Sequence, residues 1–556
     1  MRKAVFIGFF SIILVIACLF RFVRLGHLPY SLYWDEEAMR VDVKSILTTG
    51  NDMHNRPWNQ VIYPSYGDYK LPVYIWFATL SAKVFGISDF SLRLPSALAG
   101  IGTVLVGGYL ARECIALYEK KQHLCLKQVA QLSTMLVIAI CPWSILFSRT
   151  GFEGHVGQFF LALSIACLFF AKYRKCAWYL SPFFAAVATY SYFSVRFVWI
   201  ILFIFTALVL LKGSPLRMVL IKMGIPLLVF ALLLLPLLRS PLYGDSNRFR
   251  LGTDSILKNE TQGTQSNVYR QMSGDSKVDK VFYHRMWLTA RELFTNYSKN
   301  TSLDFLFLSG DPNLRHGTGR EGLFLLVFLP FFFLGLVVFF LRKREIFFFL
   351  LAWWLVALLP ASVPLNTPHA LRSLNALVPL SILIGMGLTV FLTYDYKTKM
   401  VKFFSILSCA FLLFFFTAKF TFDYFILYPA NSASSWQNGY TQLAQELYRQ
   451  KNNQESVTIL PFDDRFYLWL MAEGPYTGKD FHTWKTQDYK FNAIPNFTFQ
   501  EPDPDKITTT SETQLIAGQI PRMKEFLSKL KNAPKRIYEV KGDDGQTDFI
   551  IAEVGK

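Results

Sequence analysis

The sequence predicts an all-α polytopic membrane domain of about eleven transmembrane helices, followed by a small α/β domain. Apolar runs close to the ~20 residues needed to span a bilayer recur along most of the 556-residue chain. Only 17% of the residues are charged, whereas soluble domains average about a quarter. After Leu427 the composition becomes polar, so we assign residues 1–427 to the membrane domain and 428–556 to the second domain.

Charges around the apolar segments predict the direction in which each one crosses. Arg2 and Lys3 precede the first segment and should remain cytosolic, and no A-x-A-like site follows, so we interpret it as a retained span. Every short loop then assigned to the cytosolic side is basic, including 112–127 with Lys120 and Lys121. The C-terminal domain is therefore expected outside the cytosol, at the plasma (inner) membrane. The predicted spans are residues 4–22, 94–110, 129–147, 156–171, 177–192, 197–211, 219–238, 323–341, 346–360, 374–393 and 403–427.

The first outer loop is predicted to carry two helices that lie on the membrane surface. Residues 37–49 have apolar side chains at helical spacing and stop at Gly50, which predicts an amphipathic helix. Residues 71–86 are apolar but number only sixteen, and they contain Lys83. If this segment crossed the membrane, the basic loop 112–127 would lie outside. An interfacial helix keeps that loop in the cytosol, and we favour this interpretation.

The C-terminal domain is predicted to be a small α/β structure. We expect helices at 440–450 and 521–530, and strands at 456–460, 536–540 and 548–554. All seven cysteines fall in predicted spans or inner loops, so the outer domain has no disulfide available. The formal net charge of +18 fits positive-inside loops and anionic headgroups. Because no nucleic-acid recognition module is visible, we expect membrane lipids rather than nucleic acid as partners.

Residues with chemical character gather in the loops assigned to the outer face, which are 24–92, 148–155, 191–196, 239–321 and 361–373. A single loop charge is usually solvated or anchors a headgroup, but here five loops each bring a cation and the first also brings consecutive acids. Arg21 and Arg24 flank the outer end of the first span and are expected to contact phosphates, either of headgroups or of a bound ligand. The other outer-face candidates are Asp35, Glu36, Glu37, Asp68, Lys70, Arg93, Arg149, Glu153, His155, Arg196, Arg315, His316, Arg320, His369 and Arg372.

This pairing of acids and cations suits an enzyme that handles a phosphate-bearing lipid and a hydroxyl acceptor. Cations bind the phosphate and stabilise the charge that develops on it as a leaving group. A carboxylate accepts the proton of the acceptor as the new bond forms. We expect these acids and cations to meet in one chamber at the outer leaflet, where they also stabilise each other's ionised forms.

Short motifs in consistent order resemble the protein O-mannosyltransferase and aminoarabinose transferase group of membrane glycosyltransferases, which has the C-type fold. The resemblance covers nearly the whole chain. Its motifs are Tyr33-Trp34-Asp35-Glu36-Glu37-Ala38, Ser65-Tyr66-Gly67-Asp68-Tyr69-Lys70-Leu71-Pro72, Phe85-Gly86, Arg93-Leu94-Pro95-Ser96, Ser148-Arg149, Tyr190-Ser191-Tyr192 with Arg196, Ser309-Gly310-Asp311-Pro312 with Arg315-His316, His369-Ala370-Leu371-Arg372 and Trp436-Gln437-Asn438-Gly439-Tyr440.

The resemblance implies transfer of a sugar from a polyprenyl-phosphate carrier to an acceptor outside the cytosol, in one inverting displacement. It implies that Asp35 is the base and that Glu36 positions the acceptor or the site. It further implies that Lys70 contacts the donor phosphate, although relatives usually have Lys-Pro-Pro or Lys-x-Pro and this chain reads Lys70-Leu71-Pro72. The cations expected near the lipid phosphate are Arg149, Arg196, His369 and Arg372. The other candidates are Asp68, Arg93, Glu153, His155, Tyr192, Arg315 and His316.

No cofactor is certain from the sequence, although a divalent metal is possible. Some relatives have an aspartate supporting a metal in the second outer loop, where this chain has Glu153. The acceptor remains open between lipid, glycan and protein, and the sugar cannot be inferred.

Three other interpretations remain open. A lipid or saccharide transporter or flippase would place charges in mid-membrane, whereas the predicted spans carry few there. A receptor or scaffold using the C-terminal domain would leave the acidic cluster and the cationic loops unexplained. A chain with this fold but without activity would have the same sequence features.

Overall fold

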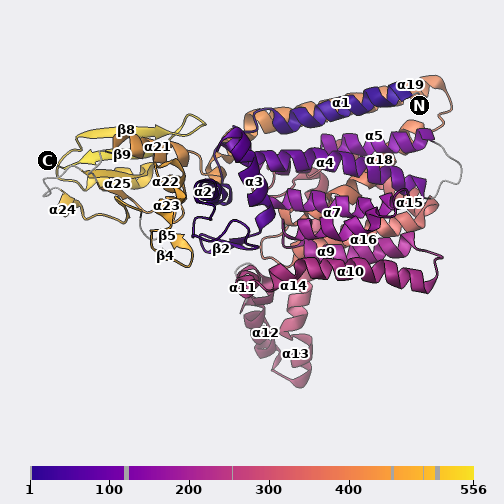
Figure 1. Cartoon of the computed structure of the whole chain (residues 1–556), viewed down its shortest axis with the longest axis horizontal. Helices are drawn as coiled ribbons and strands as arrows, with labels where there is room; N and C mark the ends of the chain where they lie inside the picture. Colours follow the sequence, from indigo (N-terminus) through magenta and orange to yellow (C-terminus); the bar gives the residue numbers. More distant parts are fainter. Residues whose placement is uncertain are drawn as a thin grey trace. The chain divides into compact units, whose positions relative to one another are not determined.

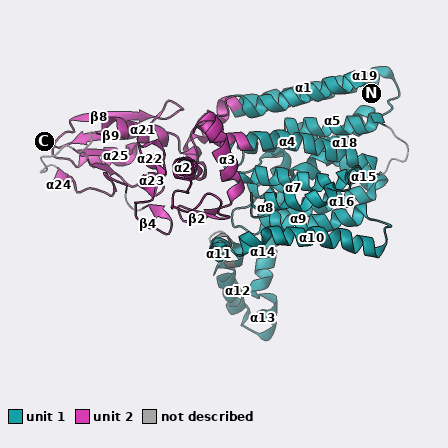
Figure 2. Cartoon of the chain, viewed as in Figure 1, with its two compact units in different colours: residues 1–23, 96–424 teal, residues 24–95, 425–556 magenta. Residues whose placement is uncertain are grey.

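The computed structural model (Figure 1) describes residues 3–117, 124–252, 255–258, 260–451, 456–491, 494–507 and 514–555. It divides into two compact units (Figure 2): unit 1 is Met1–Val23 with Ser96–Tyr424, and unit 2 is Arg24–Pro95 with Phe425–Lys556. The predicted division after residue 427 lies three residues from the start of the C-terminal part of unit 2. The first outer loop, however, belongs to the same compact unit as the C-terminal segment. Arg2, Lys120 and Lys121, used in the topology prediction, lie outside the described residues.

Each predicted span coincides with helical structure, and the polytopic prediction is confirmed. Within the described ranges, seven helices are long and apolar enough to cross a membrane, or eight if α5 and α6 form one bent span. Three further apolar segments are shorter: α8, α9 and Leu326–Arg342. The predicted number of eleven therefore stays a prediction. The helices are α1 (Lys3–Phe22), α4 (Asp89–Ala116), α5 (Leu124–Ala139), α6 (Pro142–Ser148), α7 (Glu153–Phe170), α8 (Ala177–Thr189), α9 (Val195–Leu210), α10 (Leu216–Leu238), α15 (Leu329–Arg342), α16 (Arg344–Ser362), α18 (Leu377–Thr393) and α19 (Lys399–Phe422).

Helix α18 lies at the centre of unit 1, and close packing there depends on glycine. Thirteen of the 17 residues of α18 are buried, and the helix contacts both α5 and α15. A Cβ atom added to Gly335 of α15 or to Gly387 of α18 would clash with a backbone carbonyl of the other helix. Small residues allow such close approach in membranes, where packing rather than the hydrophobic effect holds helices together. Helices α10 and α19, by contrast, expose most of their apolar side chains, as expected of surfaces that face lipid.

The break between α5 and α6 is stabilised by Arg21 of α1. Helix α6 begins at Pro142, which has no N–H to continue the ladder. The buried Arg21 guanidinium donates hydrogen bonds to the carbonyl oxygens of Ile138 and Ala139, both at 3.2 Å, and to Ser144 Oγ at 2.8 Å. The expectation that Arg21 contacts phosphates is therefore wrong, because its side chain is fully buried and both Nη groups are bonded inside unit 1.

Unit 2 contains a five-stranded mixed sheet with the order β6-β3-β7-β9-β8. Strand β3 is parallel to β6 and β7, and β9 is antiparallel to β7 and β8. Residues of β9 alternate between two cores: Phe549 and Ile551 pack with α21 and α22, whereas Ile550 and Ala552 pack with α25. The predicted α/β class is confirmed. The elements are α21 (Tyr440–Gln450), β3 (Val457–Ile459), α22 (Tyr467–Glu473), α23 (Gly478–Phe481), β6 (Phe497–Phe499), β7 (Gln514–Gln519), α25 (Ile520–Ser528), β8 (Arg536–Lys541) and β9 (Thr547–Val554).

The first-loop part of unit 2 consists of α2 (Trp34–Thr49), the hairpin β1 (Tyr63–Ser65) and β2 (Asp68–Lys70), and α3 (Pro72–Phe85). Helix α2 stops at Gly50 as predicted but begins at Trp34, so the acidic cluster forms its first turn. Its apolar face packs on α3, α22 and α23. Helix α3 has 14 residues, a length of about 21 Å, which is short of the ~30 Å bilayer core. Its interfacial placement remains a prediction.

Candidate functional site

The first turn of α2 sends three consecutive acids in three directions. Successive residues of a helix differ by about 100° around its axis. Asp35, Glu36 and Glu37 accordingly meet different partners, and all three lie where the helix dipole favours negative charge. The Asp35 side chain is 21% exposed, whereas those of Glu36 and Glu37 are fully buried. Asp35 is therefore the one of these three acids that a substrate can reach.

Asp35 is held by the neighbouring β-hairpin. Tyr66 Oη and Lys70 Nζ both donate hydrogen bonds to Asp35 Oδ1. Lys70 is also 3.0 Å from Asp68 Oδ2, so one ammonium group links two carboxylates. The hairpin turns at Tyr66 and Gly67, and Gly67 has φ +85°, a conformation that favours glycine. Burial, and then the Asp35 carboxylate, raise the pKa of Tyr66, which keeps its hydroxyl protonated as a donor.

Glu36 forms a buried ion pair with Arg93. Arg93 Nε lies 3.0 Å from Glu36 Oε1, and Arg93 Nη2 lies 3.3 Å from Oε2. Glu36 also accepts the backbone N–H of Tyr33 at 3.1 Å, while Arg93 donates to the carbonyl oxygens of Pro29 and Ser31. These contacts fix the start of α2, and with it the direction of Asp35.

Glu37 and Trp34 complete the surroundings of this turn. Burial raises the pKa of the Glu37 carboxyl to about 8, although Arg40, 3.5 Å away, opposes the shift. The Arg465 guanidinium lies 4.2 Å from the centre of the Trp34 ring and 5.6 Å from that of Tyr66. Sequence analysis missed Arg465. Arg465 follows β3, and loops at the carboxyl ends of parallel strands are frequent ligand sites. This position is the sequence signal that could have identified Arg465.

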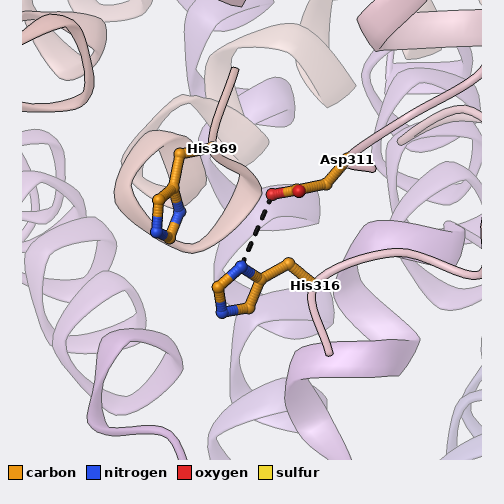
Figure 3. A group of neighbouring side chains, drawn as sticks. All are labelled: Asp311, His316 and His369. Atoms are coloured by element: carbon orange, nitrogen blue, oxygen red, sulfur yellow. Dashed lines mark ion pairs between the residues drawn. The ribbon is translucent and has the colours of Figure 1, made fainter. Parts of the chain in front are cut away.

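A second group of candidates lies in unit 1, where Asp311, His316 and His369 meet (Figure 3). The two imidazole rings are 4.5 Å apart between centroids, and His316 Nδ1 is 3.6 Å from Asp311 Oδ2. Asp311 accepts the backbone N–H of Ala370 at 2.7 Å and that of Asn313 at 2.9 Å, which ties the two loops together. Asp311 was quoted only as part of a motif, yet it organises this group.

Burial, and then the positive charge around it, favour the neutral form of His369. Burial lowers its pKa well below the usual value, and His316, Arg372 and Arg315 add to the effect. Ligand atoms of Asp311, His316 and His369 lie within 4.8 Å of one another. Two imidazoles and a carboxylate form a donor set of the kind that zinc binds, so these residues fit a divalent metal.

The other predicted cations have structural partners. Arg149 is fully buried, donates to the carbonyl oxygen of Phe20 at 2.9 Å and lies against Tyr424. Arg196 donates to the carbonyl oxygen of Phe193 at 3.1 Å and to Tyr243 Oη at 3.4 Å. Their predicted phosphate contacts therefore compete with these bonds and remain predictions.

Three further candidates surround the start of α7. Glu153 is its first residue and is partly buried, whereas His155, two residues further along, is completely buried. Tyr192 packs beside Gly157 of the same helix, where an added Cβ would clash with it. None of the three belongs to the group of Figure 3.

The structure thus brings the candidates together in two groups. Unit 2 joins Asp35 with Asp68 and Lys70, and Glu36 with Arg93. Unit 1 joins Asp311, His316 and His369, and Arg315 and Arg372 lie near enough to lower the pKa of buried His369 further. The expectation that both groups line one chamber stays a prediction.

Short stretches of the chain match curated bacterial proteins, whereas no family model matches it. Over 161 residues the chain is 27% identical to YycA of Bacillus subtilis (strain 168), and this alignment covers 28% of this chain and 21% of YycA. Over 116 residues it is 33% identical to YkcB of the same organism, covering 21% of this chain and 15% of YkcB. Both relatives are provisionally named mannosyltransferases. The chain aligns with about a fifth of the length of these relatives or less.

Solved structures match the chain over much greater lengths. ArnT from Cupriavidus metallidurans in the apo state has a TM-score of 0.56 at 12% identity, covering 98% of both chains. The same protein bound to undecaprenyl phosphate has a TM-score of 0.50 at 13% identity, covering 100% of this chain and 98% of that one. The oligosaccharyltransferase of Archaeoglobus fulgidus in the apo form has a TM-score of 0.51 at 14% identity, covering 85% of this chain and 64% of the other. The chain has the C-type glycosyltransferase fold.

This C-type fold confirms the resemblance inferred from the motifs. Identities this low support the fold and not a substrate, so the sugar donor and the acceptor have to be argued from the site.

Proposed function

We propose that this chain is an integral-membrane glycosyltransferase that moves a sugar from a polyprenyl-phosphate donor to an acceptor hydroxyl or phosphate. The observation that carries the proposal is the environment of Asp35: one accessible carboxylate, held by Lys70 and Tyr66, beside two acids that are fully buried. The C-type fold and the ArnT structure bound to undecaprenyl phosphate support the choice of donor class.

In the proposed reaction the acceptor oxygen attacks the anomeric carbon of the sugar. The bond from that carbon to the phosphate oxygen breaks, and polyprenyl phosphate leaves with the bonding electrons. Asp35 accepts the proton from the acceptor, and the sugar is inverted at the reacting carbon. Lys70 stabilises the leaving phosphate, because an ammonium group interacts more strongly with the charge that develops on it.

Glu36 and Arg93 act as positioning residues in this scheme. Both are buried, so they act through the first turn of α2 and not by contact with a substrate. This role agrees with the expectation, drawn from the family resemblance, that Glu36 positions the acceptor or the site.

We assign the group in unit 1 to the donor phosphate. Neutral His369 can donate a hydrogen bond, and Arg315 and Arg372 supply positive charge. A divalent ion held by Asp311, His316 and His369 would supply further positive charge for the same phosphate. We place the reaction on the extracytoplasmic face, because that is where the basic-loop pattern puts both groups.

Mass spectrometry of envelope glycolipids and glycoproteins would identify the sugar and the acceptor together. The comparison uses cells without the gene, complemented either with the wild type or with Asp35→Asn. We expect one glycosylated species to be absent in the deletion and in the Asp35→Asn strain, and restored by the wild type. Equal restoration by equally abundant Asp35→Asn would rule out Asp35 as the base.

A further inference from the structure

Residues following α10 form a helical projection from unit 1. It contains α11 (Tyr243–Gly252), α12 (Glu260–Ser273), α13 (Lys277–Phe282) and α14 (Arg285–Thr301). Helices α12 to α14 form a hairpin that extends sideways from the bundle, across the direction of α10 (Figure 1). A hairpin with this direction runs along the plane of the membrane and not along the spanning helices.

The base of the hairpin is fixed at the depth where a spanning helix ends. Tyr297 Oη of α14 donates to the carbonyl oxygen of Leu355 at 2.8 Å, and Asn300 Nδ2 donates to that of Ala361 at 3.3 Å. Both acceptors belong to the last turns of α16, a candidate span. Residues at the ends of spans lie near the headgroups. The hairpin therefore leaves the bundle at headgroup level.

The hairpin exposes large apolar side chains. Met272 is 81% exposed, Phe294 73%, Met286 71% and Trp287 64%. Trp287 and Phe294 are seven residues apart, so they share one face of α14. Helix α13 adds exposed Val278, Val281 and Phe282 and has no buried residue. A soluble surface rarely gathers this much apolar area without a partner.

A hollow of about 470 Å³ lies within this apolar surface, and cations border it. Tyr269, Met272, Phe282 and Trp287 line the hollow together with Arg291. Lys277, Lys280 and Arg285 are exposed on the same helices. Aromatic and apolar side chains next to lysine and arginine are typical of helices that lie in the membrane interface and meet anionic headgroups.

We propose that the α12–α14 hairpin docks on the surface of the bilayer that its own spanning helices cross. Its apolar face enters the boundary between headgroups and acyl chains, and its cations contact anionic lipid phosphates. The occupant of the exposed face is thus lipid.

The hairpin is also hydrogen-bonded to the loop that carries His369, one of the residues that we assign to the donor phosphate. Asn300 Oδ1, at the base of α14, accepts the backbone N–H of His369 at 3.1 Å and the hydroxyl of Ser373 at 3.0 Å. Docking of the hairpin on lipid therefore holds one side of the loop that carries His369. The lipid contact itself does not depend on the proposed transferase activity.

An environment-sensitive fluorophore on single cysteines tests the proposal in proteoliposomes of the full chain. The variants are Phe282→Cys and, as the matched control on the exposed polar side of α12, Asn267→Cys. The exposed Cys125 and Cys176 and the partly exposed Cys18 are replaced by serine beforehand, and the other four native cysteines are buried. Phosphatidylcholine vesicles are compared with vesicles that also contain phosphatidylglycerol, and brominated lipids serve as quenchers.

We expect the fluorophore at residue 282 to be blue-shifted and quenched by brominated lipid, more strongly with phosphatidylglycerol, and the one at 267 to remain in water. Lys280→Gln with Arg285→Gln should remove the effect of phosphatidylglycerol while quenching persists. Equal water exposure of both positions would overturn the proposal. So would shielding at 282 that appears only at a high protein-to-lipid ratio, since a second copy would then cover the face.

Discussion

At the scale of single residues, the contrast between Asp35 and its two acidic neighbours decides which group can act on a substrate. All three acids occupy one helical turn, and their environments separate their roles. The Asp35 side chain is partly exposed and pairs with Lys70. Glu36 is buried in an ion pair with Arg93, and Glu37 is buried beside Arg40. A count of acids in the sequence does not reveal this division, because it depends on what lies 100° around the helix.

Lys70→Ala should weaken use of the donor. Loss of a charged hydrogen-bond donor to phosphate costs about 1.5–3 kcal/mol, so we expect donor affinity to fall roughly 10- to 100-fold. Equilibrium binding of polyprenyl phosphate to the purified protein measures the effect. The control is a polyprenol without phosphate, whose binding should not change; an equal loss with that control would argue against phosphate contact.

Glu37 should make stability fall as pH rises. Its folded pKa, about 8, lies above that of an unfolded glutamate, so between about pH 6.5 and 8 the unfolded chain has lost a proton that the folded chain keeps. The expected loss over this range is on the order of 1–2 kcal/mol. Buried His369 acts in the opposite direction near pH 6.5, where its unfolded imidazole is still partly protonated, so the contribution of Glu37 is the difference between the wild type and Glu37→Gln. Melting temperatures at both pH values measure it. Glu37→Gln should flatten the dependence, and an unchanged slope in that variant would assign it to other groups.

At the scale of elements, the local sequence pattern was sufficient to predict where the helices lie but not which helices contact one another. Each predicted apolar run coincides with helical structure, and Gly50 predicted the end of α2. Hydropathy could not show that α5 and α6 are one broken segment, or that Arg21 of α1 satisfies the carbonyls at the break. Those contacts join residues more than a hundred positions apart, and local periodicity contains no information about them.

Close packing of α15 and α18 provides a test at the same scale. Gly387→Ala should lower the melting temperature, because the added methyl group meets the backbone of α15 and overpacking costs about 1–3 kcal/mol. Gly224→Ala in α10 is the matched control, since a Cβ there meets no atom within 4 Å. Thermal unfolding of both variants in the same detergent measures the difference. Equal melting temperatures would mean that the two helices separate easily.

At the scale of the whole molecule, the sequence predicted a membrane bundle with an α/β domain, and the structure revises how the first loop is assigned. That loop forms one compact unit with the C-terminal segment, and Ala38 and Val41 of α2 share a core with Leu468 of α22. Both parts of this core are short amphipathic segments, and neither sequence alone indicates that the two pack together. The site was predictable as far as motif order identified Asp35, Lys70 and His369. Burial of Glu36, the organising role of Asp311 and the position of Arg465 beside Trp34 depend on tertiary contacts.

The account depends most directly on Asp35 as the proton acceptor. The decisive measurement is the initial rate of sugar transfer by purified Asp35→Asn in proteoliposomes supplied with lipid-linked sugar, with binding of polyprenyl phosphate measured on the same preparation. Because the amide has nearly the same shape but cannot accept the proton, we expect transfer to fall by about 10²–10⁴-fold while binding stays close to that of the wild type. Transfer at the wild-type rate by a variant that binds normally would contradict the mechanism.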